Sequence, residues 1–224
     1  MKEKIAIALP HFGQMMYSET ALSLMRVIGQ TIAQRPSAYT LLKPAYPSQA
    51  EAEKRCITEI RNNLVEQALD EVCTKIIMLD TDQTYPPDTI INLLSHDKAI
   101  VTGQVHRRYP PFDPIMLRGT LHKYLNVPYE EMYTGEIVEI DATGAACMCV
   151  DMSVFLDVQY PWFEEIPQTE DEKPVGEDIH FWHKVKEAGY QIFMDTSIQI
   201  GHLGLRTFGR GDYVLYRKVV EKKG

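Results

Sequence analysis

Residues 75–82 read KIIMLDTD, and this stretch decides the fold. The nearly uninterrupted apolar run from Lys75 to Leu79 predicts a short strand buried on both faces, which is typical of parallel strands in α/β proteins. The strand leads directly into Asp80, Thr81 and Asp82. Ligands of open parallel sheets bind beyond the carboxyl ends of the strands. The stretch therefore predicts a ligand site at these two aspartates.

The N-terminal residues predict a first strand and a first helix. A short apolar run over residues 4–9 is typical of a buried strand, and Pro10 ends it. Ser18 offers an N-cap for the helix that follows. We expect the apolar residues at spacings of three and four to pack on the sheet, namely Leu22, Met25, Ile28 and Ile32.

The alternation of strand and helix continues to residue 105. We expect a strand over 39–43 and then a helix that begins after a capping box at 48–51. Its buried face carries residues four apart, which are Cys56, Ile60, Leu64 and Ala68. Pro86 and Pro87 suit the first turn of a next helix, and residues 98–105 return to strand. This order predicts a doubly wound, Rossmann-like, mostly parallel sheet flanked by helices.

The composition changes after residue 105. Prolines and tyrosines over 106–133 predict a long irregular connection, and strands are expected at 136–140 and 145–150. A helix over 177–188 leads into a strand over 190–195 and a glycine-rich tail. Tyr124, Tyr129 and Tyr133 in the irregular connection either stack against a sugar ring or pack the segment down.

Length and charge exclude several classes of protein. The 224 residues suffice for one large domain, and the net charge of −8 argues against a nucleic-acid partner. No run approaches the roughly 18 to 20 apolar residues that span a bilayer, and the first residues do not resemble a signal peptide. We expect a cytoplasmic enzyme. An acidic protein that binds an anionic nucleotide needs a bound cation or a few arginines.

Asp80 and Asp82 are candidate metal ligands. Two carboxylates two residues apart can converge on one hard cation and leave its other positions to diphosphate oxygens and water. Acidic pairs in loops are also common turn formers. The buried strand that precedes this pair favours the metal interpretation.

The segment Gly176-Glu177-Asp178 opens a helix. Acidic residues in a first turn are ordinary helix chemistry, because the helix N-terminus stabilises negative charge. Asp178 becomes a candidate general base if it faces the cleft.

His202 lies between Gly201 and Gly204, and glycines allow a close approach of backbone and ligand. It precedes Arg206 and Arg210, which could contact a pyrophosphate. The basic run His106 to Arg108 is either a phosphate contact or a solvated turn.

Five short motifs in this order resemble glycosyltransferases of the GT-A fold, and they are most similar to family 2. The motifs are Arg61-Asn62, residues 75–82, Thr143-Gly144-Ala145-Ala146, Gly176-Glu177-Asp178 and His202. The resemblance covers most of the chain. The N-terminal Pro10-His11-Phe12-Gly13 departs from the Pro-Thr-Tyr-Asn-like run common in the family.

The resemblance implies a metal-dependent sugar transfer from a nucleotide diphosphate-sugar to the hydroxyl of a glycan, a small molecule or a protein. Asp80, Asp82 and His202 would hold Mn²⁺ or Mg²⁺, and Asp178 would be the catalytic base of an inverting displacement. The residues implied to bind the substrates are Leu9, Pro10, His11, Arg61, Asp80, Thr81, Gly144, Ala145, Glu177 and Arg206. A single GT-A domain would span 1–224, with a nucleotide-sugar half at 1–105 and an acceptor-binding, catalytic half at 106–224.

Two other functions compete with this one. A sugar-1-phosphate nucleotidyltransferase would share the sheet and the metal-bound diphosphate, but it should carry a glycine-rich N-terminal loop with a basic residue. A non-catalytic nucleotide-sugar-binding protein would keep the fold without turnover. The presence of Asp80, Asp82, Asp178 and His202 together favours the enzyme.

Overall fold

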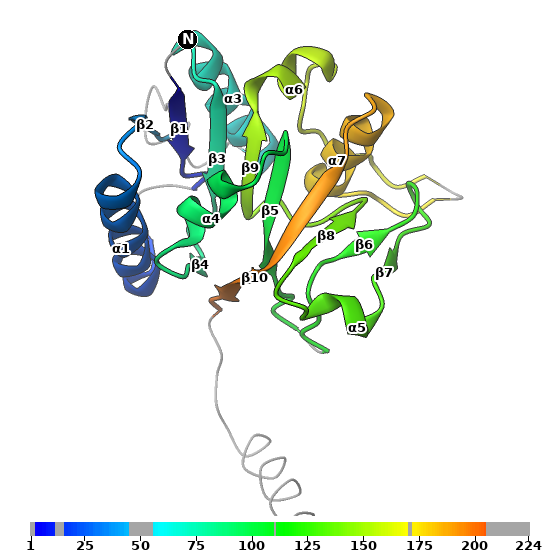
Figure 1. Ribbon diagram of the computed structural model, residues 1–224. Helices are drawn as coiled ribbons and strands as arrows, with labels where there is room; N and C mark the ends of the chain where they lie inside the picture. Colours follow the sequence, from blue (N-terminus) through cyan, green and yellow to red (C-terminus); the bar gives the residue numbers. More distant parts are fainter. Residues whose placement is uncertain (1–2, 12–15, 45–55, 110, 170–171, 205–224) are drawn as a thin grey trace, which may run out of the picture.

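One eight-stranded sheet organises the computed structural model, which describes residues 3–11, 16–44, 56–109, 111–169 and 172–204 (Figure 1). Its strands are β1 (Lys4–Ala8), β2 (Ala38–Leu42), β3 (Lys75–Leu79), β4 (Gln83–Thr84), β5 (Ile100–Val105), β8 (Ile137–Ile140), β9 (Cys147–Asp151) and β10 (Ile192–His202). The order is β2-β1-β3-β9-β5-β10-β4, and β8 pairs with β10. A separate two-stranded sheet contains β6 (Leu117–Arg118) and β7 (Leu125–Asn126).

The predicted mostly parallel sheet is confirmed, with one insertion that the strand pattern did not anticipate. Strands β1, β2, β3, β5 and β10 run in one direction. Strand β9 lies antiparallel between β3 and β5. Strand β9 comes from a later part of the chain and separates β3 from β5. The order of the strands along the chain alone would not predict this separation.

Helices cover both faces of the sheet. The helices are α1 (Ser18–Gln34), α3 (Ile57–Asp70), α4 (Thr89–Ser95), α5 (Tyr129–Met132), α6 (Met152–Asp157) and α7 (Glu177–Glu187). Successive side chains of a strand point to opposite faces. Ile5 and Ile7 of β1 accordingly join the core formed with α1 and α4, whereas Ala6 and Ala8 join the core formed with α3, α6 and α7.

The predicted buried stripe of α1 is wrong except at Ile28, which is partly buried and packs against the core. Leu22, Met25 and Ile32 are 56%, 71% and 56% exposed, and Leu24 and Val27 are buried instead. The buried face also carries hydroxyl residues whose polar groups are satisfied by backbone carbonyls. Ser23 donates to Tyr85 and Thr31 to Val27. Apolar periodicity misses such a face, because a hydrogen-bonded hydroxyl can be buried at little cost.

The starts of three helices differ from the prediction. Tyr17 rather than Ser18 is the N-cap of α1, and α4 begins at Thr89, after the two prolines. In α3 the predicted core residues Ile60, Leu64 and Ala68 are buried, but Cys56 is the exposed N-cap. The capping box at 48–51 lies outside the described residues.

Strand β10 is longer than predicted and carries its end to the edge of the sheet. An irregularity between Asp195 and Gln199 allows pairing with β5 to resume, and Gly201 and His202 then pair with β4. A Cβ on Gly201 would lie 2.3 Å from Thr84 Oγ1, so a side chain at this position would force the Thr84 hydroxyl to move. The extension brings His202 opposite Gln83.

The segment 106–133 is more ordered than the irregular connection that its composition predicts. It contains β6, β7 and α5, and Met116, Val127 and Met132 are buried. The described residues contain no helix long and apolar enough to cross a bilayer.

Candidate functional site

The predicted site residues gather where strands end. Pro10 follows β1, Asp80 follows β3, His106 follows β5, and His202 closes β10. These strands are parallel, so their carboxyl ends lie at one edge of the sheet, at the bottom of the view in Figure 1. This is the edge at which ligands of such sheets bind.

Arg61 on α3 links Asp80 to Glu177 at the start of α7. Its Nη2 donates to both carboxylate oxygens of Asp80, each at 3.0 Å, and its Nη1 donates to Glu177. The Arg61 side chain is only 4% exposed, and its guanidinium lies 5.9 Å from the centre of the Phe163 ring. The resemblance implied a substrate contact for Arg61, but in this structure its guanidinium holds two protein carboxylates.

The pKa values of this network follow from burial and charge. Burial raises the pKa of the Asp80 carboxyl above its usual value, although Arg61 acts in the opposite direction. For Arg61, burial would lower the pKa, but the charges of Asp80, Glu177 and Asp178 outweigh it and the pKa is raised. Arg61 therefore stays charged inside the protein.

Asp82 faces a different set of partners. Its Oδ2 lies 3.4 Å from His202 Nε2 and 3.2 Å from Arg108 Nη1, while Gln83 Nε2 donates to Oδ1 at 3.2 Å. Burial opposes ionisation, but His202 and Arg108 outweigh it and lower the pKa of Asp82. Asp82 is thus an ionised, partly exposed carboxylate beside an imidazole. Arg108, whose role the sequence left open, is a member of this group.

Asp82 and His202 would together supply two ligands to a divalent cation. His202 Nδ1 lies 2.7 Å from the backbone carbonyl of His106, which only accepts, so Nδ1 carries the proton. Nε2 is then the ring nitrogen that faces Asp82, and a backbone carbonyl on the other ring nitrogen is a common arrangement for metal-binding histidines. Carboxylate oxygen suits Mn²⁺ or Mg²⁺, whereas imidazole nitrogen suits a transition metal, which favours Mn²⁺ over Mg²⁺. Within the described residues, no three His, Cys, Asp or Glu side chains group around one metal position.

Asp178 lies beside Gly144. Its Oδ1 accepts the backbone N–H of Ile179 at 2.7 Å. A Cβ on Gly144 would lie 3.8 Å from its Oδ2, so this oxygen is next to the Gly144 backbone. Burial and the neighbouring charge of Glu177 raise the pKa of Asp178 to about 6. A carboxylate with such a pKa accepts a proton better than an ordinary aspartate does.

Tyr85 is a buried member of the site that no sequence motif indicated. Its hydroxyl lies 2.7 Å from the carbonyl of Asp80 and 3.1 Å from that of Ala146, and both accept from it. The backbone N–H of Asp80 also donates to Ala146 at 2.9 Å. Tyr85 therefore ties the turn that carries Asp80 to the loop that carries Gly144. Burial raises the pKa of its hydroxyl well above the usual value, so it remains a donor.

The remaining predicted residues line the same edge or lie outside the described residues. The Leu9 backbone N–H donates to Leu42, Pro10 is buried and His11 is partly exposed. Thr81 lies between the two aspartates, and Ala145 is buried next to Gly144. Arg206 and Arg210 lie outside the described residues.

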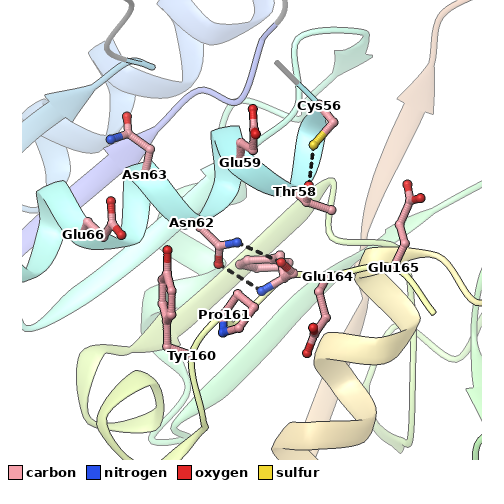
Figure 2. Close-up of a pocket in the computed structure, with 11 residues that line it drawn as sticks. Cys56, Thr58, Glu59, Asn62, Asn63, Glu66, Tyr160, Pro161, Glu164 and Glu165 are labelled. Carbon is pink, nitrogen blue, oxygen red and sulfur yellow. Dashed lines mark hydrogen bonds between the residues drawn. The ribbon is translucent and has the colours of Figure 1, made fainter. Parts of the chain in front are cut away.

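A pocket of about 590 Å³ lies between α3 and the segment 160–165 (Figure 2). Asn62 clasps this segment by exchanging two hydrogen bonds with the backbone of Phe163, at 2.8 and 3.0 Å. The lining includes Glu59, Glu66, Glu164 and Glu165 but none of the predicted site residues. The Asn62 clasp holds Phe163 against α3, one residue from Arg61.

No protein-family model matches the sequence. No curated protein matches it either. Solved structures match in fold. A197 from STIV is 11% identical with a TM-score of 0.54, and the match covers 91% of this chain and 86% of that one. GalNAc-T7, solved with UDP, GalNAc and Mn²⁺, is 11% identical with a TM-score of 0.59, and the match covers 94% of this chain and 44% of that one. This chain therefore spans less than half of the GalNAc-T7 chain. These likenesses show the fold, which is the GT-A fold that the motifs implied.

Proposed function

We propose that the protein is a metal-dependent glycosyltransferase that moves a sugar from a nucleotide diphosphate-sugar to an acceptor hydroxyl with inversion. One observation carries this proposal. The Asp82 carboxylate and the His202 imidazole lie 3.4 Å apart, where both would be available to one cation, at the same sheet edge as Asp178, whose pKa of about 6 suits a base. A divalent cation bound there stabilises the negative charge that develops on the leaving diphosphate.

The acceptor side of the reaction depends on Asp178. One of its oxygens is used by the Ile179 N–H, and the other lies next to Gly144. An acceptor hydroxyl beside that second oxygen gives its proton to it as it attacks the anomeric carbon. A base opposite the leaving group leads to single displacement and inversion, by the geometric reasoning that applies to inverting glycosidases.

The donor side depends on charge that the chain supplies locally. Arg108 is half exposed and pairs with Asp82, so its guanidinium can turn to a phosphate oxygen when a diphosphate arrives. Arg61 is buried and bonded to Asp80 and Glu177, so it orients these carboxylates and does not itself reach for the donor. Arg108 would therefore bind a phosphate, whereas Arg61 would position Asp80 and Glu177.

A nucleotide-binding experiment tests the proposal. Melting temperatures are measured with UDP, GDP, CDP and their sugar conjugates, each with and without Mn²⁺, and release of free sugar from each donor is followed. UDP-GalNAc is the first donor to test, because the structural relative GalNAc-T7 was solved with UDP and GalNAc. Ligand binding to the folded state raises the melting temperature by mass action. We expect one nucleotide to do so only with metal.

The test variant is Asp82→Ala, and its matched control is Asp97→Ala. Asp97 is exposed just before β5, at the opposite edge of the sheet. We expect Asp82→Ala to lose the metal-dependent shift and Asp97→Ala to retain it. If no nucleotide shifts the wild-type melting temperature with Mn²⁺, the proposed function is wrong.

A further inference from the structure

Two tyrosines near the candidate site are exposed to solvent and are not packed into the core. Tyr129 on α5 is 73% exposed and Tyr133, directly after α5, is 45% exposed. Tyr124 is partly buried and packs against the core, as aromatic residues in connecting segments usually do. Packing in the core therefore does not account for Tyr129 and Tyr133.

His106, Tyr129 and Tyr133 form one aromatic cluster. The His106 and Tyr133 rings are stacked with centres 6.3 Å apart and planes at 21°, and Tyr129 meets Tyr133 edge-on at 5.7 Å. His106 Nε2 also lies 3.3 Å from the Tyr133 hydroxyl. The spacing of four residues puts the two tyrosines on the same side of this helical turn. The result is a small aromatic corner with polar tips.

This aromatic cluster adjoins the site through His106. The His106 carbonyl accepts the Nδ1–H of His202, whose other nitrogen faces Asp82. Figure 1 shows α5 near the carboxyl end of β10. The segment that follows His106 returns to Ile115, which bonds to Val105 and would lie 3.5 Å from a Cβ on Gly144. The cluster is therefore adjacent to His202, and the segment that starts at His106 ends at Ile115 next to Gly144.

The turn that carries the tyrosines is held firmly. Arg118 donates to both oxygens of Glu131, at 2.9 and 2.6 Å. The Met132 side chain is buried, and its carbonyl accepts the buried Gln104 amide. These contacts hold α5 in place, while the Tyr129 and Tyr133 rings remain exposed to solvent. A preorganised surface loses little entropy when it binds a ligand.

The chemistry of the cluster fits a saccharide. A sugar ring has an apolar C–H face and a rim of hydroxyls, and a tyrosine offers an apolar ring and a polar tip. A protein partner needs roughly 800 Å² of surface on each side, which three rings do not supply. A small aromatic corner suits one or two sugar rings better.

We propose that the aromatic cluster is the acceptor subsite and that the acceptor is a saccharide. The proposal rests on the proposed function and names the acceptor that it leaves open. One hydroxyl of a saccharide held on Tyr129 and Tyr133 would serve as the acceptor. The hydroxyl oxygen bonds to the anomeric carbon of the donor, its proton passes to Asp178, and the bond from that carbon to the diphosphate oxygen breaks.

Saccharide binding by the full chain tests this subsite directly. Saturation-transfer NMR and calorimetry are run without donor on trisaccharides of glucose, galactose, mannose, xylose and N-acetylglucosamine. We expect at least one to bind, Tyr129→Ala and Tyr133→Ala to weaken it by about tenfold each, and Tyr129→Phe to retain it, because the ring supplies the contact. Tyr160→Ala is the matched control, since Tyr160 is 57% exposed but lines the pocket of Figure 2.

UDP binding with Mn²⁺ and donor hydrolysis in water are measured on the same variants. We expect Tyr129→Ala to leave both unchanged. If the wild type binds a nucleotide but no trisaccharide, or if Tyr129→Ala binds the trisaccharide equally well, the acceptor subsite is wrong and the proposed function stands. If no nucleotide binds while a trisaccharide binds through Tyr129, the saccharide site stands and the transferase proposal fails.

Discussion

Arg61 holds both carboxylate oxygens of Asp80 at 3.0 Å, whereas Asp82, two residues later, faces His202 and Arg108. The two aspartates have the same residue type and lie in the same turn, but their environments differ. Asp80 is paired inside the protein and Asp82 is directed to the partly exposed side of the site.

Replacing Arg61 should strongly destabilise the fold. Arg61→Met leaves Asp80 and Glu177 as largely buried carboxylates without their cation, which costs about 3–5 kcal/mol. Arg35→Met is the control, because Arg35 pairs with Glu3 where both side chains are about one third exposed and the loss should be much smaller. Urea denaturation measures both free energies of unfolding. Equal losses would contradict a special role for the buried network.

Asp82→Asn and Asp80→Asn should separate metal binding from stability. We expect Asp82→Asn to weaken Mn²⁺ binding in the presence of UDP by about tenfold or more, with little change in melting temperature. Asp80→Asn should lower the melting temperature, because Arg61 loses one of its two charged partners. Mn²⁺ electron paramagnetic resonance and thermal denaturation check the two effects. The distinction fails if Asp80→Asn weakens Mn²⁺ equally at unchanged stability.

Asp178 should set the acid limb of the pH profile. Its pKa is about 6, in a setting that includes the charges of Glu177, Arg61 and Asp80. The base must be deprotonated, so kcat/KM should fall about tenfold per pH unit below that pKa and level off above it. Asp178→Asn should reduce turnover by about a hundredfold or more while donor binding persists. An unchanged acid limb in the variant would assign that limb to another group.

The same carboxyl should destabilise the fold at neutral pH. Because the folded pKa exceeds the unfolded value near 3.9, the native state binds more protons between these two values, and stability falls as pH rises through that window. Asp178→Asn should therefore be more stable than the wild type at pH 7, by about 1–3 kcal/mol, and the advantage should vanish near pH 4. Urea denaturation at both pH values measures this difference.

Tyr85→Phe should loosen the turn that carries Asp80. Removing a buried hydroxyl that serves two carbonyls costs about 1–2 kcal/mol. Tyr39→Phe provides a control, because the Tyr39 hydroxyl donates to the Arg35 carbonyl at 2.8 Å, away from the site edge. Only Tyr85→Phe should also weaken UDP and Mn²⁺ binding in calorimetry. Equal effects of both variants on binding would assign Tyr85 a purely structural role.

Arg108→Gln should act in opposite directions on metal and nucleotide. Without Arg108 the Asp82 carboxylate loses a competing cation, so Mn²⁺ alone should bind a few-fold more tightly, and more so at low salt. UDP binding should weaken, because a phosphate contact is lost. Arg107→Gln is the control, since Arg107 pairs with Asp113. Unchanged UDP affinity in Arg108→Gln would remove this arginine from the donor side.

Local patterns predicted the parts of the fold that depend on near neighbours. The apolar run before Asp80 predicted β3 over its observed length, and Ile60, Leu64 and Ala68 predicted the buried face of α3. The same reasoning failed for α1, where Leu22 and Met25 are exposed. Burial of Ser23 depends on the distant Tyr85 carbonyl, which no local pattern contains.

The sequence by itself determined which residue types lie at the carboxyl edge of the sheet, because a strand delivers the residues that follow it to its own end. Only the tertiary structure decided what each side chain does there. Arg61 reaches Asp80 from another element, and the extension of β10 brings His202 to Asp82. These partners are far apart along the chain. The difference between the paired Asp80 and the available Asp82 therefore arises only when the folded chain brings them together.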